Sequence, residues 1–297
     1  MNDFCNDGNI YELIVKTNFS IVYKFIDNND GKPYILKVIP RNSKRKEADL
    51  CKKIPIHTNL IRFIEEKKFN KDIDDEYIFL IFEYFEGESL HKFAKEKRHK
   101  FTPTNIKIIF FQILNAVSTL HKSNIVHNDI KFENILIDPH TLHIKLIDFG
   151  LSHIGKEKKC SSVFGSLPYL APEIISQKTY SIYSDVWALG ILLFAMIEGK
   201  FPFYSNSQDK ILEDISSNSV KGTVKKVYRS KYSIETSENI FNALVSTSKN
   251  RKNNTNYRYE MKLLMEVSVL CLRSTPENRL TVDEILSLSV FNNIMIM

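Results

Sequence analysis

Four polar side chains lie close together in the sequence and have the types that nucleotide chemistry requires. Asp129, Lys131 and Asn134 belong to the string His127-Asn-Asp-Ile-Lys-Phe-Glu-Asn134, and Asp148 follows fourteen residues later. Transfer of a phosphoryl group from a nucleotide needs a carboxylate that aligns the acceptor hydroxyl, a cation for the γ-phosphate and oxygen ligands for Mg²⁺. Asp129 suits the first role, Lys131 the second, and Asn134 with Asp148 the third. The residue types and their spacing therefore indicate a phosphotransferase site.

Two apolar runs flank these polar residues. Ile135-Leu-Ile137 follows Asn134 directly, and Ile144-Lys-Leu-Ile147 ends just before Asp148. Short apolar runs between polar segments are typical of buried strands. We expect the two strands to present Asn134 and Asp148 at the same end.

The chain has 297 residues, which is enough for one large domain or two lobes. Its first part predicts a helix around Arg45–Ile54 and short strands separated by Asn, Asp and Gly turns. The predicted strands are Ile10–Val15, Ser20–Ile26, Pro33–Ile39, Leu60–Lys68 and Tyr77–Glu83. After Gly87 the apolar residues recur at helical spacing, and Thr102-Pro103 predicts the start of a long helix. The sequence predicts an α+β chain with a β-rich lobe over residues 1–83 and a helical lobe over residues 84–297.

The composition excludes several classes of protein. Lys and Arg number 41 against 35 Asp and Glu, and a formal net charge of +6 does not predict a nucleic-acid-binding surface. The four cysteines are far apart and form no CxxC pair, which favours free thiols in a reducing compartment. The longest apolar run, Ala188–Ile197, is too short to span a membrane, and the N-terminus lacks the pattern of a signal peptide. We expect an intracellular protein without a membrane segment.

Further motifs extend the pattern over most of the chain. Asp148 begins the tripeptide Asp-Phe-Gly, Ala171-Pro-Glu173 follows it, and Pro276-Glu-Asn-Arg279 lies near the C-terminal end. Together with the catalytic string, these motifs resemble the eukaryotic-type protein kinase family over about residues 10–290. The resemblance implies a two-lobed protein kinase fold, with a small antiparallel-sheet lobe and a large helical lobe, and with ATP and Mg²⁺ between them.

The resemblance also implies roles for residues of the second lobe. Asp129 would accept the proton of the substrate hydroxyl, and Lys131, two residues later, is the form found in serine/threonine kinases. Glu173 would pair with Arg279. Asp185 would bond the backbone of the catalytic loop, and thus have a structural role.

Residues of the first lobe are assigned to the nucleotide in the same way. Lys37 would hold the α- and β-phosphates and Glu47 would orient it, although a plain surface glutamate is the alternative at that position. Only ten residues separate the two, so the helix that carries Glu47 should be short and supported by another surface, such as a second copy of the chain. The other implied cofactor-binding residues are Val15, Val22, Ile35, Phe82, Glu83, Phe85 and Leu136, with Asn134 and Asp148 as the metal ligands.

The chain departs from the family pattern at the phosphate loop. The family has three glycines there, which allow backbone N–H groups to approach the phosphates. Here Val15, Thr17 and Ser20 occupy the three positions. Each carries a β-carbon, so the loop must stay in ordinary φ/ψ space. We expect weaker ATP affinity without loss of the transfer chemistry.

A second departure lies beside the catalytic aspartate. Asn128 replaces the arginine that pairs with a phosphate on the activation segment of similar kinases. The corresponding segment here, from Leu151 to Leu170, contains Ser161 and Ser162. We predict activity that does not need phosphorylation of this segment.

The string His127-Asn-Asp129 is also similar to the late serine/threonine kinases of large insect DNA viruses of the baculovirus type. That resemblance implies a late-infection role in the host cytoplasm or nucleus. It also implies a small, basic DNA-packaging protein as the substrate. An insertion around residues 218–260 contains basic clusters, which fit either a solvated loop or a docking surface for an acidic partner.

Two alternatives to an active kinase follow from the missing glycines. One is a pseudokinase that keeps the fold as a scaffold. The other is a regulator that binds a nucleotide and transfers nothing. Incorporation of labelled phosphate separates both from a kinase, and a MgATP-dependent rise in melting temperature separates them from each other.

Overall fold

The computed structural model describes residues 9–41, 47–69, 76–203, 205, 207–216, 257–292 and 294. It divides into two compact units, Met1–Glu86 and Gly87–Met297. The first unit is built on an antiparallel sheet, and the second is mainly helical. The predicted α+β class, with a sheet lobe followed by a helical lobe, is confirmed.

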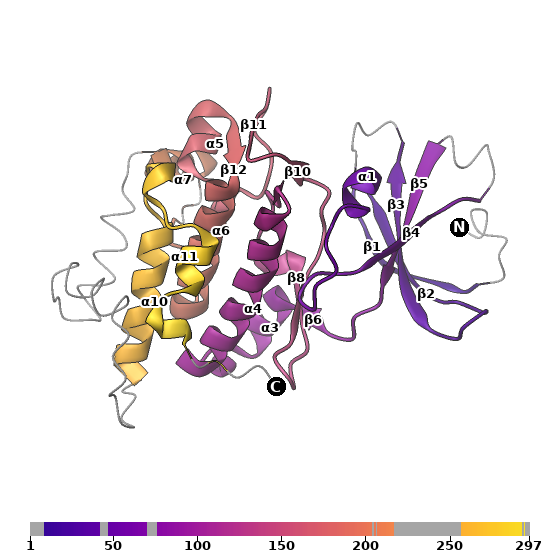
Figure 1. Cartoon of the computed structure of the whole chain (residues 1–297), viewed down its shortest axis with the longest axis horizontal. Helices are drawn as coiled ribbons and strands as arrows, with labels where there is room; N and C mark the ends of the chain where they lie inside the picture. The colour runs from indigo at the N-terminus through magenta and orange to yellow at the C-terminus, as the bar shows by residue number, and fades with distance from the viewer. Residues whose placement is uncertain are drawn as a thin grey trace. The chain divides into compact units, whose positions relative to one another are not determined.

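Unit 1 contains a five-stranded antiparallel sheet in the order β1-β2-β3-β5-β4 (Figure 1). The strands are β1 (Tyr11–Lys16), β2 (Ile21–Ile26), β3 (Pro33–Pro40), β4 (Phe63–Lys67) and β5 (Tyr77–Glu83). Strand β4 is shorter than the predicted run Leu60–Lys68. Leu60 and Ile61 are buried just before the strand, so the apolar run extends beyond β4 itself.

The sheet has two distinct faces because successive side chains of a strand point to opposite sides. Leu36 and Val38 of β3 lie on one face, in a core cluster with Phe25, Phe79 and Ile81. Partly buried aromatic side chains extend this cluster across the strands. The alternation places Ile35, Lys37 and Ile39 on the opposite face.

Helix α1 (Glu47–Cys51) is the short helix of unit 1. Its described part begins at Glu47, because residues 42–46 lie outside the described ranges. Glu47, Ala48, Leu50 and Cys51 are all buried. A helix of one turn is unstable alone, so the burial of these side chains stabilises it.

Unit 2 contains helices, short strands and 3₁₀ turns (Figure 1). The helices are α3 (Leu90–Glu96), α4 (Pro103–Lys122), α5 (Pro172–Gln177), α6 (Ile182–Glu198), α7 (Gln208–Ser216), α10 (Tyr257–Cys271) and α11 (Val282–Leu286). The strands are β6 (Glu88–Ser89), β7 (Ile125–Val126), β8 (Ile135–Ile137), β9 (Ile144–Leu146), β10 (His153–Ile154), β11 (Glu157–Lys159) and β12 (Thr179–Ser181). The 3₁₀ turns are Arg98–Lys100, Phe132–Asn134, Leu167–Tyr169, Pro276–Asn278 and Ser289–Phe291.

Local signals fix the ends of the two central helices. Thr102 caps α4 by accepting a hydrogen bond from the Asn105 N–H, and Pro103 is the first helical residue, as predicted. Helix α6 starts with a capping box between Ser181 and Ser184 and ends at Gly199, whose φ of 73° favours glycine. The apolar run Ala188–Ile197 is therefore the buried middle of α6. None of the described helices is both long and apolar enough to cross a membrane.

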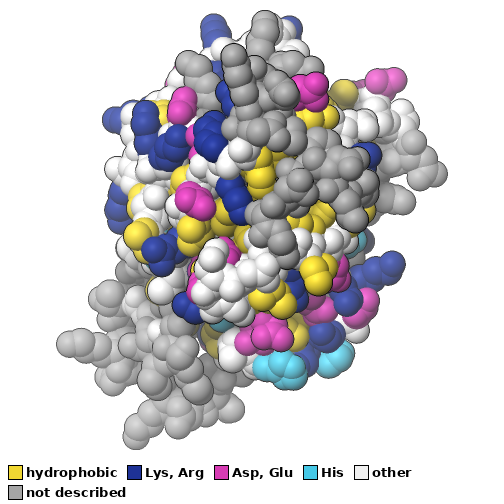
Figure 2. Space-filling view, turned by 90° about the vertical axis from the view of Figure 1, so that its right-hand side faces the viewer, with side chains coloured by type: hydrophobic (Ala, Val, Ile, Leu, Met, Phe, Trp, Pro, Cys, Tyr) yellow, Lys and Arg dark blue, Asp and Glu magenta, His cyan; other side chains and the backbone are white. Residues whose placement is uncertain are grey.

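Figure 2 looks onto unit 1 and shows hydrophobic side chains interspersed with lysines and carboxylates. Exposed hydrophobic residues of this unit include Leu13, Ile14, Val15 and Phe19, at or beside the turn between β1 and β2. In unit 2, residues 257–260 of the predicted insertion form the first turn of α10. The predicted basic clusters of the insertion lie outside the described residues.

Candidate active site

Lys37 and Glu47 form a buried ion pair in unit 1. Lys37 Nζ donates a hydrogen bond to Glu47 Oε1 at 2.6 Å, and the two residues are 8% and 4% exposed. The buried position of Glu47 excludes the alternative of a surface glutamate. Its second oxygen, Oε2, is buried and has no hydrogen-bond partner among the residues that the structure describes. Strand β3 supplies the lysine and helix α1 the carboxylate, the two elements in which the sequence placed these residues.

The register of the sheet brings other predicted residues to the face that carries Lys37. Val22 lies opposite both Val15 on β1 and Lys37 on β3, and Ile35 lies opposite Phe82 on β5. Paired residues on neighbouring strands share a face. Four of the residues predicted to bind the nucleotide therefore lie on the same face of the sheet as Lys37. They are Val15, Val22, Ile35 and Phe82.

Two other residues predicted to bind the nucleotide, Glu83 and Phe85, lie at or just after the end of β5. Glu83 is opposite Tyr34 in the register, and its carboxylate accepts a hydrogen bond from the backbone N–H of Arg62 at 2.9 Å. The side chain of Glu83 is thus engaged by the neighbouring segment. Phe85 is half-buried just after the strand.

The turn between β1 and β2 is closed by the hydroxyl of Thr17. Thr17 Oγ1 accepts hydrogen bonds from the N–H groups of Phe19 at 3.1 Å and Ser20 at 3.0 Å, and the Thr17 N–H donates to the Ser20 carbonyl at 2.9 Å. No residue from Val15 to Ser20 has a positive φ. The side chain of Thr17 therefore occupies the backbone donors that a glycine loop would offer to a phosphate.

A compact hydrogen-bond network surrounds Asp129 in unit 2. Lys131 Nζ donates to Asp129 Oδ2 at 2.6 Å and to Ser166 Oγ at 3.0 Å. Asn134 Nδ2 donates to the same Asp129 oxygen at 2.7 Å, and Ser166 Oγ donates to Asp129 Oδ1 at 3.3 Å. Asp129 and Asn134 are buried. The structure thus brings together three residues predicted from one string with a serine from a distant segment.

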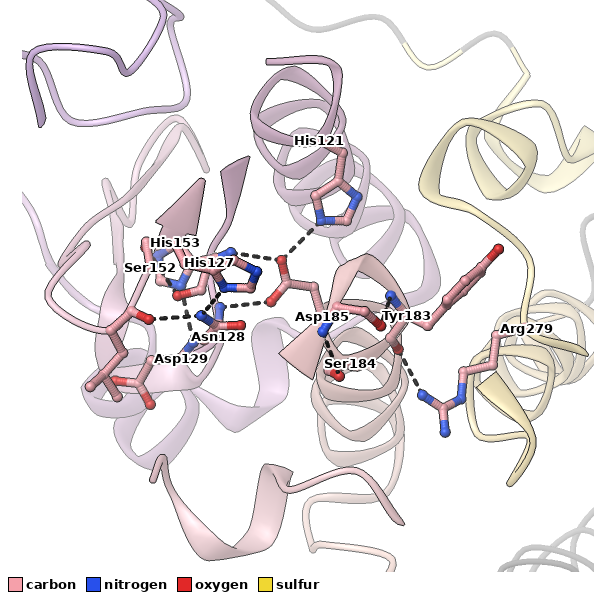
Figure 3. Close-up of polar contacts among 12 residues, drawn as sticks. His121, His127, Asn128, Asp129, Ser152, His153, Tyr183, Ser184, Asp185 and Arg279 are labelled. Carbon is pink, nitrogen blue, oxygen red and sulfur yellow. Dashed lines mark hydrogen bonds and ion pairs between the residues drawn. The ribbon is translucent and has the colours of Figure 1, made fainter. Parts of the chain in front are cut away.

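Asp185 of α6 holds the loop that begins at His127 and lies beside it in Figure 3. Its two carboxylate oxygens accept hydrogen bonds from the N–H groups of His127 and Asn128, each at 2.8 Å. His121 Nε2 lies 2.9 Å from Oδ2. Burial opposes ionisation of Asp185, but the contacts with His121 and the His127 backbone hold the pKa of this carboxyl below its usual value. The predicted structural role of Asp185 is confirmed.

Asn128 connects the catalytic loop to the activation segment. Its φ of 67° lies in the left-handed region, which asparagine tolerates better than most residues. Asn128 Nδ2 donates to the Leu151 carbonyl at 2.7 Å and to His153 Nδ1 at 2.9 Å (Figure 3). Ser152 Oγ donates to the His127 carbonyl at 3.0 Å, and β10 pairs with β7. An uncharged amide therefore occupies the position where similar kinases carry arginine.

The oxygen ligands predicted for a metal lie at the ends of adjacent strands. Strands β8 and β9 are paired, and the Ile147 N–H donates to the Asn134 carbonyl at 2.9 Å. Asp148 follows directly, is exposed, and has a φ of 65°. Because Asn134 Nδ2 donates to Asp129, the amide oxygen of Asn134 is its atom suited to a cation. A carboxylate and an amide oxygen fit a hard divalent cation such as Mg²⁺. The predicted pocket residue Leu136 is half-buried on β8.

Glu173 and Arg279 form a buried bidentate pair. Two guanidinium nitrogens of Arg279 donate to the two oxygens of Glu173, each at 2.7 Å. Arg279 also donates to the Tyr183 carbonyl at 2.8 Å (Figure 3) and lies over the ring of Trp187. The pairing that the family resemblance implied is confirmed. It fixes the segment Ala171–Glu173 against α6.

Several contacts near the site were not predicted from the sequence. The hydroxyl of Tyr180 bonds both backbone groups of Phe164, and His153 accepts from Asn128. These residues are ordinary in type and distant in sequence from their partners. A signal did exist for Thr17, because a threonine beside a short turn can accept backbone N–H groups.

A model of the family described as protein kinase domain matches residues 10–291 of this chain. The chain therefore belongs to the protein kinase family. The match includes both units and all of the site residues described above.

Curated relatives agree with this assignment. The chain is similar to the catalytic subunit of the cAMP-dependent protein kinase of Schizosaccharomyces pombe, with 33% identity over 217 residues, 70% of this chain and 41% of that protein. It is 32% identical to an Aurora kinase of Dictyostelium discoideum over 81% of this chain and 62% of that protein. The serine/threonine-protein kinase CLA4 of Candida albicans is 32% identical over 71% of this chain and 21% of its own length. The chain thus spans less than two thirds of each of these relatives.

Proposed function

We propose that the protein is a serine/threonine kinase that transfers the γ-phosphoryl group of ATP to hydroxyls of protein substrates. The network of Asp129, Lys131, Asn134 and Ser166 carries this proposal. It combines a buried carboxylate, a cation and a hydroxyl in one place. Relatives whose names identify them as serine/threonine kinases support the same specificity.

In the proposed reaction, Asp129 orients the substrate hydroxyl and accepts its proton. The oxygen of the hydroxyl forms a bond to the γ-phosphorus while the bond from this phosphorus to the bridging oxygen of ADP breaks. Lys131 offsets charge on the transferred group and lies 2.6 Å from the Asp129 carboxylate. ADP leaves with the bonding electron pair of the broken bond.

The remaining residues bind the nucleotide. Lys37, held by Glu47, would bind its α- and β-phosphates, and the apolar surface around Val15, Val22 and Ile35 would contact its base. Asn134 and Asp148 would hold Mg²⁺, which neutralises phosphate charge when bound. Phe82, Glu83, Phe85 and Leu136 complete the proposed binding set.

The closed turn at Thr17 supports the expectation of weak ATP binding. Its amides donate to a side chain of the protein, so phosphates gain fewer backbone hydrogen bonds. This turn is also the observation that favours the two alternatives, a pseudokinase scaffold and a nucleotide-binding regulator. The intact Asp129 network favours catalysis over both.

The test is transfer of labelled γ-phosphate to a mixture of basic and acidic protein acceptors in the presence of Mg²⁺. We expect incorporation on serine or threonine, and none from an Asp148→Asn variant. No incorporation with a MgATP-dependent rise in melting temperature would establish the regulator instead. Neither incorporation nor a shift would establish the scaffold. Replacing Mg²⁺ by Ca²⁺ or a chelator tests the proposed metal dependence.

Substrate, partner and location are further parts of the proposal. A small basic DNA-packaging protein as substrate, and a viral late role in the host cytoplasm or nucleus, depend on the resemblance to insect-virus kinases. The relatives named above are from cellular organisms and give that resemblance no support. The homodimer through α1 also lacks support, since Ala48, Leu50 and Cys51 of the described helix are buried. Gel filtration with light scattering would test it.

A further inference from the structure

The middle of the activation segment is attached to the segment that follows α5. Strand β11 pairs antiparallel with β12, with Lys158 opposite Tyr180, and the two strands lie side by side in Figure 1. The Cys160 N–H donates to the Lys178 carbonyl at 3.0 Å, and Lys178 Nζ donates to the Ser161 carbonyl at 2.9 Å. These bonds are made by uncharged backbone groups and one lysine. No phosphate is needed for any of them.

Tyr180 adds a more specific contact. Its hydroxyl accepts a hydrogen bond from the Phe164 N–H at 2.7 Å and donates one to the Phe164 carbonyl at 2.8 Å. The two rings are stacked, with centroids 4.1 Å apart and an interplanar angle of 3°. Tyr180 is fully buried, and burial raises the pKa of its hydroxyl, which therefore stays protonated and able to donate. One side chain thus fixes both backbone polar groups of Phe164.

Phe164 is connected to the active site through the next two residues, Gly165 and Ser166. Gly165 has a φ of 110°, and a β-carbon there would lie 3.2 Å from Leu170 Cδ2. The chain turns sharply at this glycine, and the next residue is Ser166. Ser166 Oγ accepts from Lys131 and donates to Asp129. A shift of Phe164 would therefore move the hydroxyl that joins the catalytic aspartate and lysine.

We propose that Tyr180 is a positioning residue for phosphoryl transfer, which holds Phe164 so that Ser166 is presented to Asp129 and Lys131. This role rests on the proposed kinase function. It acts within unit 2 and is independent of the residues of unit 1 that bind phosphate. It also holds the activation segment at Phe164 without a charged modification.

The test is the variant Tyr180→Phe, which keeps the ring and its stacking and removes the hydroxyl. We expect kcat for a peptide acceptor to fall on the order of 10-fold, less than the 10²-fold that a misplacement of about 1 Å can cause. The KM for ATP should stay unchanged, since Lys37 and Glu47 are not affected. Tyr183→Phe is the matched control, because the contacts of Tyr183 with Ser181 and Arg279 are made by its backbone, and it should keep the wild-type kcat.

A double-mutant cycle with Ser166→Ala separates positioning from general loosening of the fold. If Tyr180 acts through Ser166, Tyr180→Phe should lower kcat little further in the Ser166→Ala background. Additive effects of the two substitutions, or a wild-type kcat for Tyr180→Phe, would overturn the role of Tyr180. If Tyr180→Phe does not fold, Phe164→Ala removes the stacked ring and tests that part of the contact, with the same expected non-additivity with Ser166→Ala.

The two levels of the proposal fail in different ways. A wild-type protein that transfers no phosphate would remove both the kinase function and the role of Tyr180. An active wild-type protein with an unaffected or additive Tyr180→Phe variant would remove the role of Tyr180 alone.

Discussion

The side-chain amide of Asn128 donates a hydrogen bond to Nδ1 of His153 at 2.9 Å. This bond joins the residue before Asp129 to the first strand of the activation segment. Both partners are uncharged in this arrangement, because a histidine whose Nδ1 accepts must be neutral. Together with the bond from Asn128 to the Leu151 carbonyl, it stands in the place of the arginine–phosphate pair of similar kinases. Neither of these two hydrogen bonds depends on a phosphate.

The first prediction concerns phosphorylation. Because Asn128 reaches Leu151 and His153 without a phosphate, phosphatase treatment should leave the rate of peptide phosphorylation unchanged. Asn128→Ala removes both hydrogen bonds and should lower kcat on the order of 10-fold. Steady-state kinetics before and after treatment, with the phosphorylation state checked by mass spectrometry, measure this. Activity that disappears with phosphatase and returns only after rephosphorylation would contradict the prediction.

The second prediction concerns stability at mildly acidic pH. Burial lowers the pKa of His153, with Lys158 adding to the effect and Asp185 opposing it. The folded protein therefore keeps His153 neutral, whereas the unfolded chain takes up a proton near pH 6.5. The free energy of unfolding should fall as the pH drops below about 6.5. Urea unfolding at a series of pH values measures the slope.

His153→Gln is the matched variant for this experiment, since glutamine can still accept from Asn128 and does not titrate. Its slope should be shallower than that of the wild type. The slope should not vanish, because burial also lowers the pKa of His127. An identical slope in the variant would show that His153 contributes nothing to the pH dependence.

The third prediction concerns the buried ion pair of unit 1. Lys37→Met leaves Glu47 buried without its partner, so it should destabilise the protein on the order of 3 kcal/mol. The double variant Lys37→Met/Glu47→Gln removes the charge as well and should recover most of the stability. It should not recover phosphoryl transfer, because the proposed phosphate contact of Lys37 is still missing. Chemical unfolding and transfer assays on the three proteins test both statements. Equal stability losses in the single and double variants would contradict the first.

The fourth prediction concerns the turn at Thr17. Thr17→Val keeps the β-branched shape and removes the hydroxyl that accepts from Phe19 and Ser20. The released amides can then donate to phosphates, so the KM for ATP should fall several-fold with little change in kcat. Thr17→Ser keeps the hydroxyl and should behave like the wild type. A KM that rises in Thr17→Val and not in Thr17→Ser would show that the closed turn assists nucleotide binding.

Much of the fold was predictable because its signals are local. The strands alternate in polarity, Thr102-Pro103 starts α4, and the catalytic string places Asp129 and Asn134 five residues apart. The pair of Lys37 and Glu47 was also predictable, because each residue lies on a short element with its own sequence pattern. The strand pattern around Lys37 predicts the position of the lysine, and the spacing of apolar residues after Glu47 predicts the helix that carries the glutamate.

Contacts that depend on tertiary packing could not be predicted in this way. Tyr180 and Phe164 are brought together by the pairing of β11 with β12, which have no strong strand pattern. His153 is buried because β10 pairs with β7, and a two-residue strand leaves no periodicity to detect. The predicted strand Leu60–Lys68 was too long because Leu60 and Ile61, which are buried just before β4, have the apolar character of strand residues.

Comparison of the wild type with Asp129→Asn tests the central claim most directly. Both proteins would receive Mg²⁺, ATP with a labelled γ-phosphate and a serine-containing protein acceptor. The proposed role of Asp129 predicts label on serine or threonine with the wild type and a rate lower by about 10²–10⁴ with the variant, at similar ATP affinity. Equal rates in the two proteins, or no label on any hydroxyl with the wild type, would contradict it.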